Sequence, residues 1–301
     1  MTKSADTTSI FRDFGFFSKE ASANGADFTA GAITSMLDAL PGRNYWCVEF
    51  GAWDGVHGSN SRRLIQEQGY SAVLIEGHCR RFAELQKLYA DNTKISTHNQ
   101  YVGFDDTDGL DSVLAKTPIP RDFDFLTVDI DGNDWHVWQA VRQYRPKIVM
   151  IEFNPTIPPE VDFVQKADPR VNHGCSLTAL ARLGKIKNYE LTAVLGVNAF
   201  FVTGELFRYF NIADNSPAAL WTNRDAVTYF FLGYDGQVFL RGNRKLPWQE
   251  QVVFDEKKVQ VLPAFLRIYP WNRAARRIYM ALYHPLTAIN KVWRCLIGRK
   301  H

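Results

Sequence analysis

Cysteine is scarce in this chain of 301 residues, and its few copies are poorly placed to hold a metal. Cys47, Cys79, Cys175 and Cys295 stand far apart, and no C-x-x-C spacing joins any pair. Scattered single cysteines are typical of a reducing compartment and argue against a structural zinc site. We therefore expect a cytoplasmic protein.

Long hydrophobic runs are also missing. Charged residues interrupt every apolar stretch well before the roughly 18 residues that a membrane-spanning helix needs. The first residues include acids and lack the apolar core of a secretory signal peptide. With 46% hydrophobic and 22% charged residues, the composition indicates a globular protein of two average domains or one large α/β domain.

Acidic residues are absent after Glu256. Residues 257–301 carry ten of the 35 Lys and Arg, so residues 1–256 hold 25 basic against 32 acidic residues. A mildly acidic body thus precedes a basic tail. Nucleic acid is not expected as a partner, because the positive charge is local and no binding motif accompanies it.

Short β-rich runs alternate with helical stretches in the body of the chain. Strands are predicted at 45–50, 72–76, near 95, at 123–130 and at 147–153, with helices between them. This alternation predicts right-handed βαβ units and a parallel sheet. Residues 189–194 and 198–202 then predict an antiparallel pair at the end of the sheet. In such sheets a ligand binds beyond the carboxyl ends of the strands.

The first strand ends in a glycine turn, with Gly51 and Gly55 flanked by Glu49 and Asp54. Glycines at such a turn let the backbone approach a ligand closely. The turn is not G-x-G-x-x-G and lacks the lysine of a P-loop, so a pyrophosphate fits poorly. The acids suit a cationic or amino-bearing ligand better, although a simple tight turn explains the spacing equally well.

The second strand ends in Glu76, 25 residues after Gly51. An acid at this place can accept hydrogen bonds from both ribose hydroxyls of a nucleoside ligand. A single glutamate at a strand end is more often merely solvated. Its pairing with the glycine turn favours the ligand interpretation.

Oxygen-bearing side chains also gather at the ends of the next two strands. Because side chains alternate along a strand, Asp129 and Asp131 are predicted to share one side if the strand extends that far, and Glu152 and Asn154 are predicted to share one side of the next strand. Asp131, Glu152 and Asn154 could hold Mg²⁺ or Mn²⁺, or Asp131 could act directly as a base. The more ordinary interpretation is that the acids near residue 131 only make turn and helix-capping hydrogen bonds.

Candidates for covalent catalysis are lacking. The sequence has no G-x-S-x-G motif and no convincing Cys/His pair. His173, in a loop before a helix, is a candidate general base, although single histidines usually serve no catalytic role.

Together these blocks resemble the FkbM-like family of S-adenosylmethionine-dependent methyltransferases. The resemblance covers about residues 44–206, and the matching segments, in order, are 48–55, 59–60, 74–76, 128–134, 151–155, 174–177 and 198–202. It implies a Rossmann-like class I methyltransferase sheet, mostly parallel with an antiparallel last strand, and S-adenosylmethionine as cofactor. Carried over by position, the residues that would bind it are Glu49, Gly51, Ala52, Asp54, Gly55, Asn60, Glu76 and Asp129. Trp53 stands where the usual class I loop has a further glycine.

The resemblance implies an enzyme that methylates a hydroxyl group, with a sugar, a glycan or a glycan-like metabolite as acceptor. An aliphatic hydroxyl must lose its proton to become a good nucleophile. Asp131, or a metal held by Asp131, Glu152 and Asn154, would supply that activation, with His173 as a second candidate base. Carboxylates together with Trp53 would stabilise the cationic sulfonium.

The rest of the chain surrounds this predicted domain of residues 44–206. Residues 1–43 are expected to form a helical extension and 207–260 a β-hairpin that either caps the acceptor side or is an ordinary edge hairpin. The tail, 261–301, combines basic residues with an amphipathic pattern at Ile289, Val292, Trp293 and Leu296. Such a helix suits the anionic inner surface of a membrane, and docking on the protein's own acidic body is the alternative.

Two other functions stay open on the sequence alone. Asp129 and Asp131 form a D-x-D motif after an apolar run, as in metal-dependent glycosyltransferases. The glycine turn before it favours the methyltransferase. The other alternative is a non-catalytic nucleoside-binding scaffold at a membrane, against which the acids at four strand ends argue, because buried unpaired carboxylates are costly.

Overall fold

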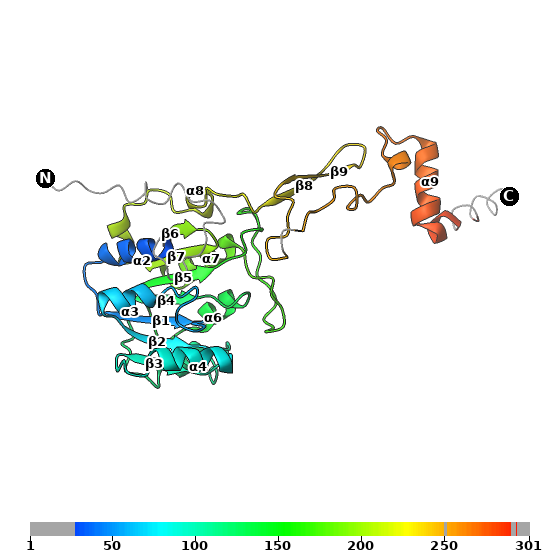
Figure 1. Ribbon diagram of the computed structural model, residues 1–301. Coiled ribbons are helices and arrows are strands. Elements are labelled where there is room, and N and C mark those ends of the chain that lie inside the picture. The colour runs from blue at the N-terminus through cyan, green and yellow to red at the C-terminus, as the bar shows by residue number, and fades with distance from the viewer. Residues whose placement is uncertain (1–27, 250–251, 290–292, 294–301) are drawn as a thin grey trace. The chain divides into compact units, whose positions relative to one another are not determined.

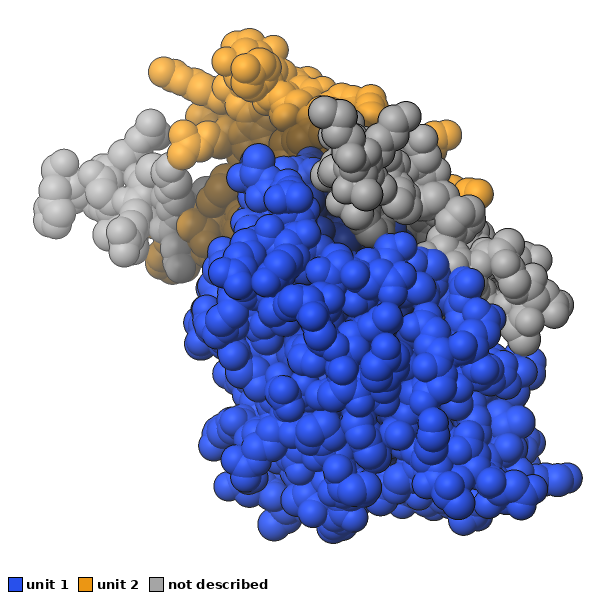
Figure 2. Space-filling model, turned by 90° about the vertical axis from the view of Figure 1, so that its left-hand side faces the viewer, with its two compact units in different colours: residues 1–225 blue, residues 226–301 orange. Residues whose placement is uncertain are grey.

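The computed structural model describes residues 28–249, 252–289 and 293. The chain divides into two compact units, Met1–Asp225 and Ala226–His301 (Figure 2). Most of the helical extension predicted for residues 1–43 lies outside the described residues, and α2 (Phe28–Asp38) belongs to the part that is described. Among the described residues, no helix is both long enough and apolar enough to cross a membrane.

The first unit is built on a seven-stranded sheet in the order β3-β2-β1-β4-β5-β7-β6 (Figure 1). Five strands pair in parallel, and β7 runs antiparallel to both of its neighbours. The predicted Rossmann-like, mostly parallel sheet is therefore confirmed. The strands are β1 (Trp46–Phe50), β2 (Ser71–Ile75), β3 (Ile95–His98), β4 (Phe125–Val128), β5 (Ile148–Glu152), β6 (Tyr189–Leu195) and β7 (Asn198–Thr203).

Both faces of this sheet are covered, because every residue of the central strand β4 is buried. Alternate strand residues on one face pack in a core cluster with residues of α2, α3 (Arg62–Gln68) and α4 (Cys79–Leu88). On the other face Trp138 of α6 (Asp134–Ala140) lies 4.9 Å from Phe201, ring centre to ring centre, and Gly184 of α7 (Leu177–Ile186) packs against the same two rings. This double cover explains why the strands are nearly continuous apolar runs.

One of the predicted strands is shorter than expected. The helix α3 after the glycine turn has Ser61 as its N-cap, and Gly69 ends it with a left-handed φ of 70°. The strand predicted for 123–130 stops at Val128, so Asp131 is not a strand residue and takes a φ of +57° in the following turn. The premise that strand alternation aligns Asp129 with Asp131 is thus wrong.

The antiparallel pair predicted after residue 188 is confirmed, and the structure adds its place in the sheet. β6 forms the edge, and β7 returns between β5 and β6. Glu152 at the end of β5 therefore lies directly opposite Asn198 at the start of β7. The remaining short elements of the unit are α5 (Leu110–Leu114), η1 (Phe207–Phe210) and α8 (Pro217–Leu220).

The second unit contains the predicted hairpin. Strands β8 (Thr228–Leu232) and β9 (Val238–Gly242) pair antiparallel, and the Asp235-Gly236 turn joins them, with Gly236 at φ +82°. Its role as a cap stays a prediction. η2 (Ala264–Leu266) and α9 (Arg273–Tyr283) follow. Of the amphipathic pattern predicted at 289–296, residues 290–292 and 294–296 lie outside the described residues.

Candidate active site

The glycine turn brings the ends of two neighbouring strands together. Gly51 follows β1 with a φ of +76°, and a Cβ built on it would lie 2.4 Å from the backbone oxygen of Asp129, beyond the end of β4. Any side chain here would force one of the two strand ends to move. Gly55 has a similar φ of +77°, but a Cβ there would meet the side chains of Leu85 and Tyr89 rather than backbone. Both glycines thus lie close to other parts of the protein, and a close approach of this turn to a ligand stays a prediction.

Glu76 holds this turn in place. The residue follows β2 and is buried; its carboxylate accepts hydrogen bonds from the backbone N–H of Trp53 at 2.9 Å and of His78 at 2.7 Å. A carboxylate has about four acceptor positions, so about two remain for a ligand. Trp53 itself has a φ of +48°, which only glycine adopts cheaply. A glycine, which the resemblance implies at this position, would take this backbone conformation without strain.

The ring of Trp53 already has a cationic partner. The Arg81 guanidinium lies over it, 3.9 Å from the ring centre, and the tryptophan side chain is 44% exposed. One face of the ring is thus occupied by protein. Stabilisation of a sulfonium by Trp53 stays a prediction, and the sulfonium would have to lie on the ring face that Arg81 does not cover.

The carboxylate of Glu49 accepts its hydrogen bonds from other groups of the protein. This buried carboxylate at the end of β1 accepts from the Ser59 hydroxyl at 2.7 Å, the Asn60 N–H at 2.6 Å and the Ser61 hydroxyl at 2.5 Å. Burial raises the pKa of Glu49, and the hydrogen bonds of Ser61 and Ser59 oppose that rise. Glu49 thus fixes the start of α3, and Asn60 takes part through its backbone.

Asp54 organises the turn that follows the glycines. One of its oxygens accepts from the N–H groups of Val56 and His57 at 2.8 Å each, and the other lies 2.5 Å from the His57 ring nitrogen Nδ1. Burial works against its ionisation, but the hydrogen bonds of His57 and Val56 lower the pKa of Asp54. Ala52, between the glycines, is buried and donates its N–H to Ile75.

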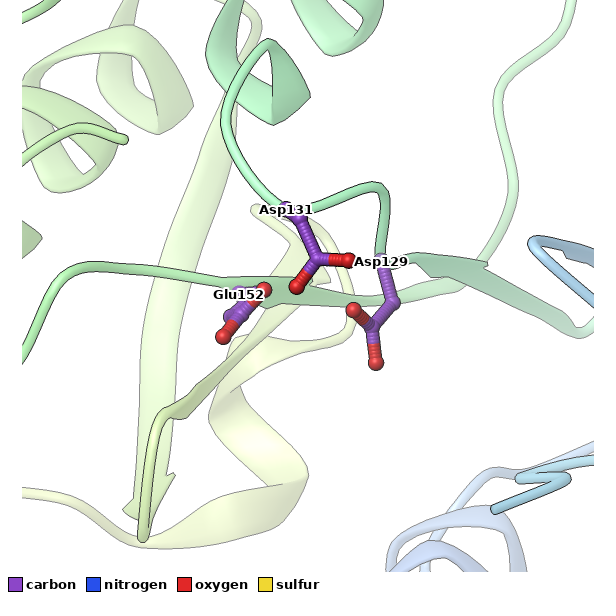
Figure 3. Close-up of side chains that lie close together, drawn as sticks. All are labelled: Asp129, Asp131 and Glu152. Atoms are coloured by element: carbon purple, nitrogen blue, oxygen red, sulfur yellow. The ribbon is translucent and has the colours of Figure 1, made fainter. Parts of the chain in front are cut away.

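Three carboxylates converge at the ends of β4 and β5 (Figure 3). One oxygen from each of Asp129, Asp131 and Glu152 lies within 4.8 Å of the others; Asp131 is exposed and its two neighbours are half-buried. The figure shows the three groups pointing toward a common space from two strand ends and the turn after β4. Sequence reasoning named all three residues, and the fold brings them together.

The electrostatics of this carboxylate cluster favour an extra proton. Burial, then repulsion from Asp129, holds the pKa of Glu152 well above its usual range, and Asp134 and Asp131 add to the effect. The side chain of Glu152 also hydrogen-bonds Asp129. The raised pKa favours the protonated form of Glu152, and a proton shared with Asp129 lowers the repulsion within the cluster.

Asp134 shapes the turn on which Asp131 sits. Its buried carboxylate accepts from the N–H groups of Ile130 and Gly132, each at 2.9 Å. Burial raises the pKa of Asp134 to about 6 against the opposing effect of these bonds. The ordinary interpretation, that acids here make turn hydrogen bonds, thus holds for Asp134.

The side-chain amide of Asn154 contacts the backbone of His173. The Asn154 amide donates to the His173 carbonyl at 2.9 Å, and its oxygen accepts two bonds from Thr156. Buried Gln165 accepts from the N–H groups of His173 and Gly174, 2.7 Å each, and so shapes this loop. His173 is exposed. The loop also touches the turn after β4, because a Cβ on Gly132 would lie 3.1 Å from the Asn172 Cα.

Sequence reasoning missed two polar groups at this edge of the sheet. Asn198 is buried opposite Glu152, and its Oδ1 has no hydrogen-bond partner in the described part of the chain. Gln165 shapes the His173 loop. A polar residue opening the apolar strand 198–203 was the available signal for Asn198. Nothing in the spacing marks Gln165.

Comparison with known proteins finds similarity in structure but not in sequence. No family model matches the sequence, and no curated protein matches it significantly. The N-terminal domain of EvdMO1, solved in the presence of SAH (S-adenosylhomocysteine) and D-fucose, is 11% identical, with a TM-score of 0.38 over 58% of this chain and 80% of that one. M. capricolum TrmK with SAH is 10% identical, with a TM-score of 0.35 over 56% and 65%. The METTL16 MTase domain is 11% identical, with a TM-score of 0.38 over 59% and 66%.

The first two of these structures were solved with S-adenosylhomocysteine, and the third is a methyltransferase domain by name. The likeness concerns the course of the backbone. Membership of the FkbM-like family stays a prediction, and the chemistry of this site depends on its own residues.

Proposed function

We propose that the protein is an S-adenosylmethionine-dependent O-methyltransferase that acts on a hydroxyl of a sugar, a glycan or a glycan-like metabolite. One observation carries the proposal: Glu76 holds the glycine turn with about half of its acceptor capacity left, and the Asp129 end of the carboxylate cluster touches that same turn. A place for a nucleoside and a place for a base thus adjoin.

The donor side is built from Gly51, Gly55, Glu76 and Asp129. Glu76 would accept hydrogen bonds from the ribose hydroxyls, and the Asp129 carboxylate would face the amino group of the methionine end. Glu49 and Asp54 support this side as positioning residues, because their oxygens already hold the segments after Gly55. S-adenosylmethionine, when bound, supplies an electrophilic methyl group on a cationic sulfur.

On the acceptor side the residue that takes up a proton is Asp131. The acceptor oxygen forms a bond to the methyl carbon while the carbon–sulfur bond breaks and its electron pair stays on sulfur. The hydroxyl proton passes to the Asp131 carboxylate, which is exposed and so accessible to an incoming molecule. The raised pKa of Glu152 favours its protonated form, so we assign Glu152 the role of a hydrogen-bond donor and not that of the base. His173 is the second candidate base.

A polyhydroxyl acceptor fits the chemistry of the cluster. Ionised carboxylates only accept hydrogen bonds, whereas a protonated carboxyl group also donates one. Asp131 would accept a hydrogen bond from one sugar hydroxyl, and Glu152, whose raised pKa favours its protonated form, would donate one to a neighbouring hydroxyl. The unpaired Asn198 amide oxygen, opposite Glu152, adds a further acceptor.

A divalent cation is the alternative way to neutralise the same cluster. Carboxylates are the hard oxygen ligands that Mg²⁺ or Mn²⁺ prefers. A bound cation would then neutralise the negative charge that protonation of Glu152 would otherwise lower. The predicted ligand Asn154 fits this less well than Asp129, because the Asn154 oxygen already accepts two hydrogen bonds. A glycosyltransferase would use the same acids with a nucleotide-sugar.

The test begins with calorimetric titration of the protein with S-adenosylhomocysteine, and then with UDP-sugars and Mn²⁺. Micromolar binding of the first ligand is expected. Binding only of the metal-loaded nucleotide-sugar would replace the proposal with glycosyl transfer, and binding of neither would favour a scaffold.

Turnover is then compared in wild type, Asp131→Asn and Asp106→Asn, an exposed aspartate outside the site, with sugars screened as acceptors. Loss of a general base costs about 10²–10⁴-fold in turnover. Asp131→Asn should show that loss with unchanged affinity for S-adenosylhomocysteine, and Asp106→Asn should behave as wild type. Full turnover in Asp131→Asn would remove Asp131 from the mechanism, and the same loss in His173→Ala would assign the proton to His173.

A further inference from the structure

Exposed apolar side chains are concentrated in the second unit. Of 28 large hydrophobic residues that are exposed among the described residues, 20 lie between Tyr229 and Trp293. They include Phe230 and Leu232 on the hairpin and Leu282 on α9. Surfaces with so many exposed apolar groups mark contacts with a partner or a membrane.

Helix α9 separates its residues into a basic and an apolar side. At 100° per residue, Arg273, Arg276 and Arg277 fall within one narrow sector, and Ile278 and Leu282 fall on the opposite side. Ala275 is buried, so the first turn of the apolar side packs within the unit. The next two turns remain open, with Ile278 44% and Leu282 57% exposed.

Aromatic rings line one border between these two sides. Trp271 and Tyr279 lie 5.1 Å apart, ring centre to ring centre, and Tyr279 and Tyr283 lie 5.0 Å apart and stacked. Tryptophan and tyrosine are enriched where the apolar interior of a membrane meets its polar headgroups. Their place along α9 corresponds to that boundary.

The arginines have no anionic partner in the described part of the chain. None of the ion pairs there involves Arg273, Arg276 or Arg277. They also occupy the first turns of α9, where the helix dipole is positive and no acidic residue offsets them. This placement is unfavourable for the helix by itself, and an external anion would relieve it.

We propose that α9 lies in the surface of an anionic phospholipid membrane, with Ile278 and Leu282 inserted among the acyl chains and the three arginines at the headgroup phosphates. A lipid surface supplies both an apolar layer and dense negative charge along the whole length of a helix. Because no acidic residue follows Glu256, the segments before and after α9 add no negative charge that the anionic lipids would repel.

The experiment is sedimentation of the full-length protein with phosphatidylcholine vesicles, with and without about a third phosphatidylglycerol. Wild type should pellet with the anionic vesicles and stay in solution with the neutral ones. The variant with Arg273→Gln, Arg276→Gln and Arg277→Gln should bind on the order of a hundredfold more weakly, because each basic residue near an anionic surface contributes about fivefold.

Leu282→Asp tests the apolar side, and Ile186→Asp is its matched control. Ile186 is 71% exposed on α7 in the first unit, so this variant makes the same change outside α9. Leu282→Asp should lower binding at least about tenfold, the worth of one buried leucine, whereas Ile186→Asp should bind as wild type. Unchanged melting temperatures and S-adenosylhomocysteine affinity show that the variants are folded.

Three results would overturn the proposal. The first is sedimentation of wild type with anionic vesicles at no more than the background level, and the second is sedimentation of Leu282→Asp at the wild-type level. The third is a dimer, detected by light scattering, that dissociates in Leu282→Asp, together with no binding of wild type to vesicles. That result would show that the apolar side of α9 contacts a second copy of the chain and not a membrane.

Discussion

Replacing Glu76 with alanine tests the donor site most directly. The change removes a buried carboxylate that already accepts hydrogen bonds from Trp53 and His78 and that we expect to accept two more from ribose hydroxyls. A hydrogen bond to a charged group contributes about 1.5–3 kcal/mol. Loss of two such bonds should weaken S-adenosylhomocysteine binding by about 3 kcal/mol or more, which is at least about a hundredfold.

The same substitution also loosens the glycine turn, and the assay must separate the two effects. Two backbone N–H groups lose their partner, so the ligand-free protein should lose about 1–3 kcal/mol of stability. Glu76→Gln keeps one acceptor oxygen but turns an amide N–H₂ toward a backbone N–H. It should bind about tenfold more weakly than wild type, since only part of the acceptor capacity is lost.

Calorimetric titration with S-adenosylhomocysteine measures the affinity for the ligand. Thermal unfolding without ligand measures the stability that is lost when the turn loosens. Glu84→Ala is the control, because Glu84 is an exposed glutamate on the adjoining helix α4. It should match wild type in both assays. If Glu76→Ala bound the ligand with wild-type affinity, Glu76 would have only its structural role and the ribose assignment would be refuted.

Three further predictions concern the turn, the buried acid and the cluster. Gly51→Ala should destabilise the protein by about 1–3 kcal/mol more than Gly58→Ala, since both have a left-handed φ but only the Gly51 Cβ meets backbone; chemical denaturation measures the difference. The pKa of Asp134 rises on folding from 3.8 to about 6, so the native state binds more protons and stability should fall by about 2 kcal/mol as pH rises from 4 to 6. Asp134→Asn should show a flatter dependence of stability on pH. Dialysis against a chelator should leave methyl transfer unchanged, because the raised pKa of Glu152 favours its protonated form, which lowers the charge of the cluster without a cation.

Each of these has an outcome that would contradict it. Equal stability of Gly51→Ala and Gly58→Ala would mean that the strand ends separate at no cost. An unchanged pH slope in Asp134→Asn would place the proton uptake elsewhere. Turnover lost on chelation and restored by Mg²⁺ would show that a cation occupies the place assigned to the proton.

Much of the fold was predictable because its signals are local. Apolar runs of strand length alternate with helical patterns, and this pattern predicts a parallel sheet with both faces covered. Gly69, Gly51 and the Asp235-Gly236 turn mark chain reversals that need unusual backbone angles. The position of β7 between β5 and β6 has no local signal, because it depends on which edges remain free once the parallel strands have paired.

The candidate site was predictable in its residues and less so in their roles. Glu49, Glu76, Asp129 and Glu152 stand at or beside strand ends, and a parallel sheet gathers those ends at one edge. Whether such an acid faces a ligand or the protein depends on neighbours far along the chain. Glu49 meets the segment 59–61 and is fully used there, whereas Glu76 retains acceptor capacity.

The sequence by itself determined the sheet class, the glycine turn and the set of acids, since each follows from periodicity or from the backbone freedom of single residues. Tertiary structure alone decided that Asp131 meets Asp129 and Glu152 from a turn and not from a strand, and that Asn198 lies opposite Glu152. The physical reason is that charges interact through space. The distance between carboxylates, and hence which of them keeps a proton, is set by strand order and register, which no single segment encodes.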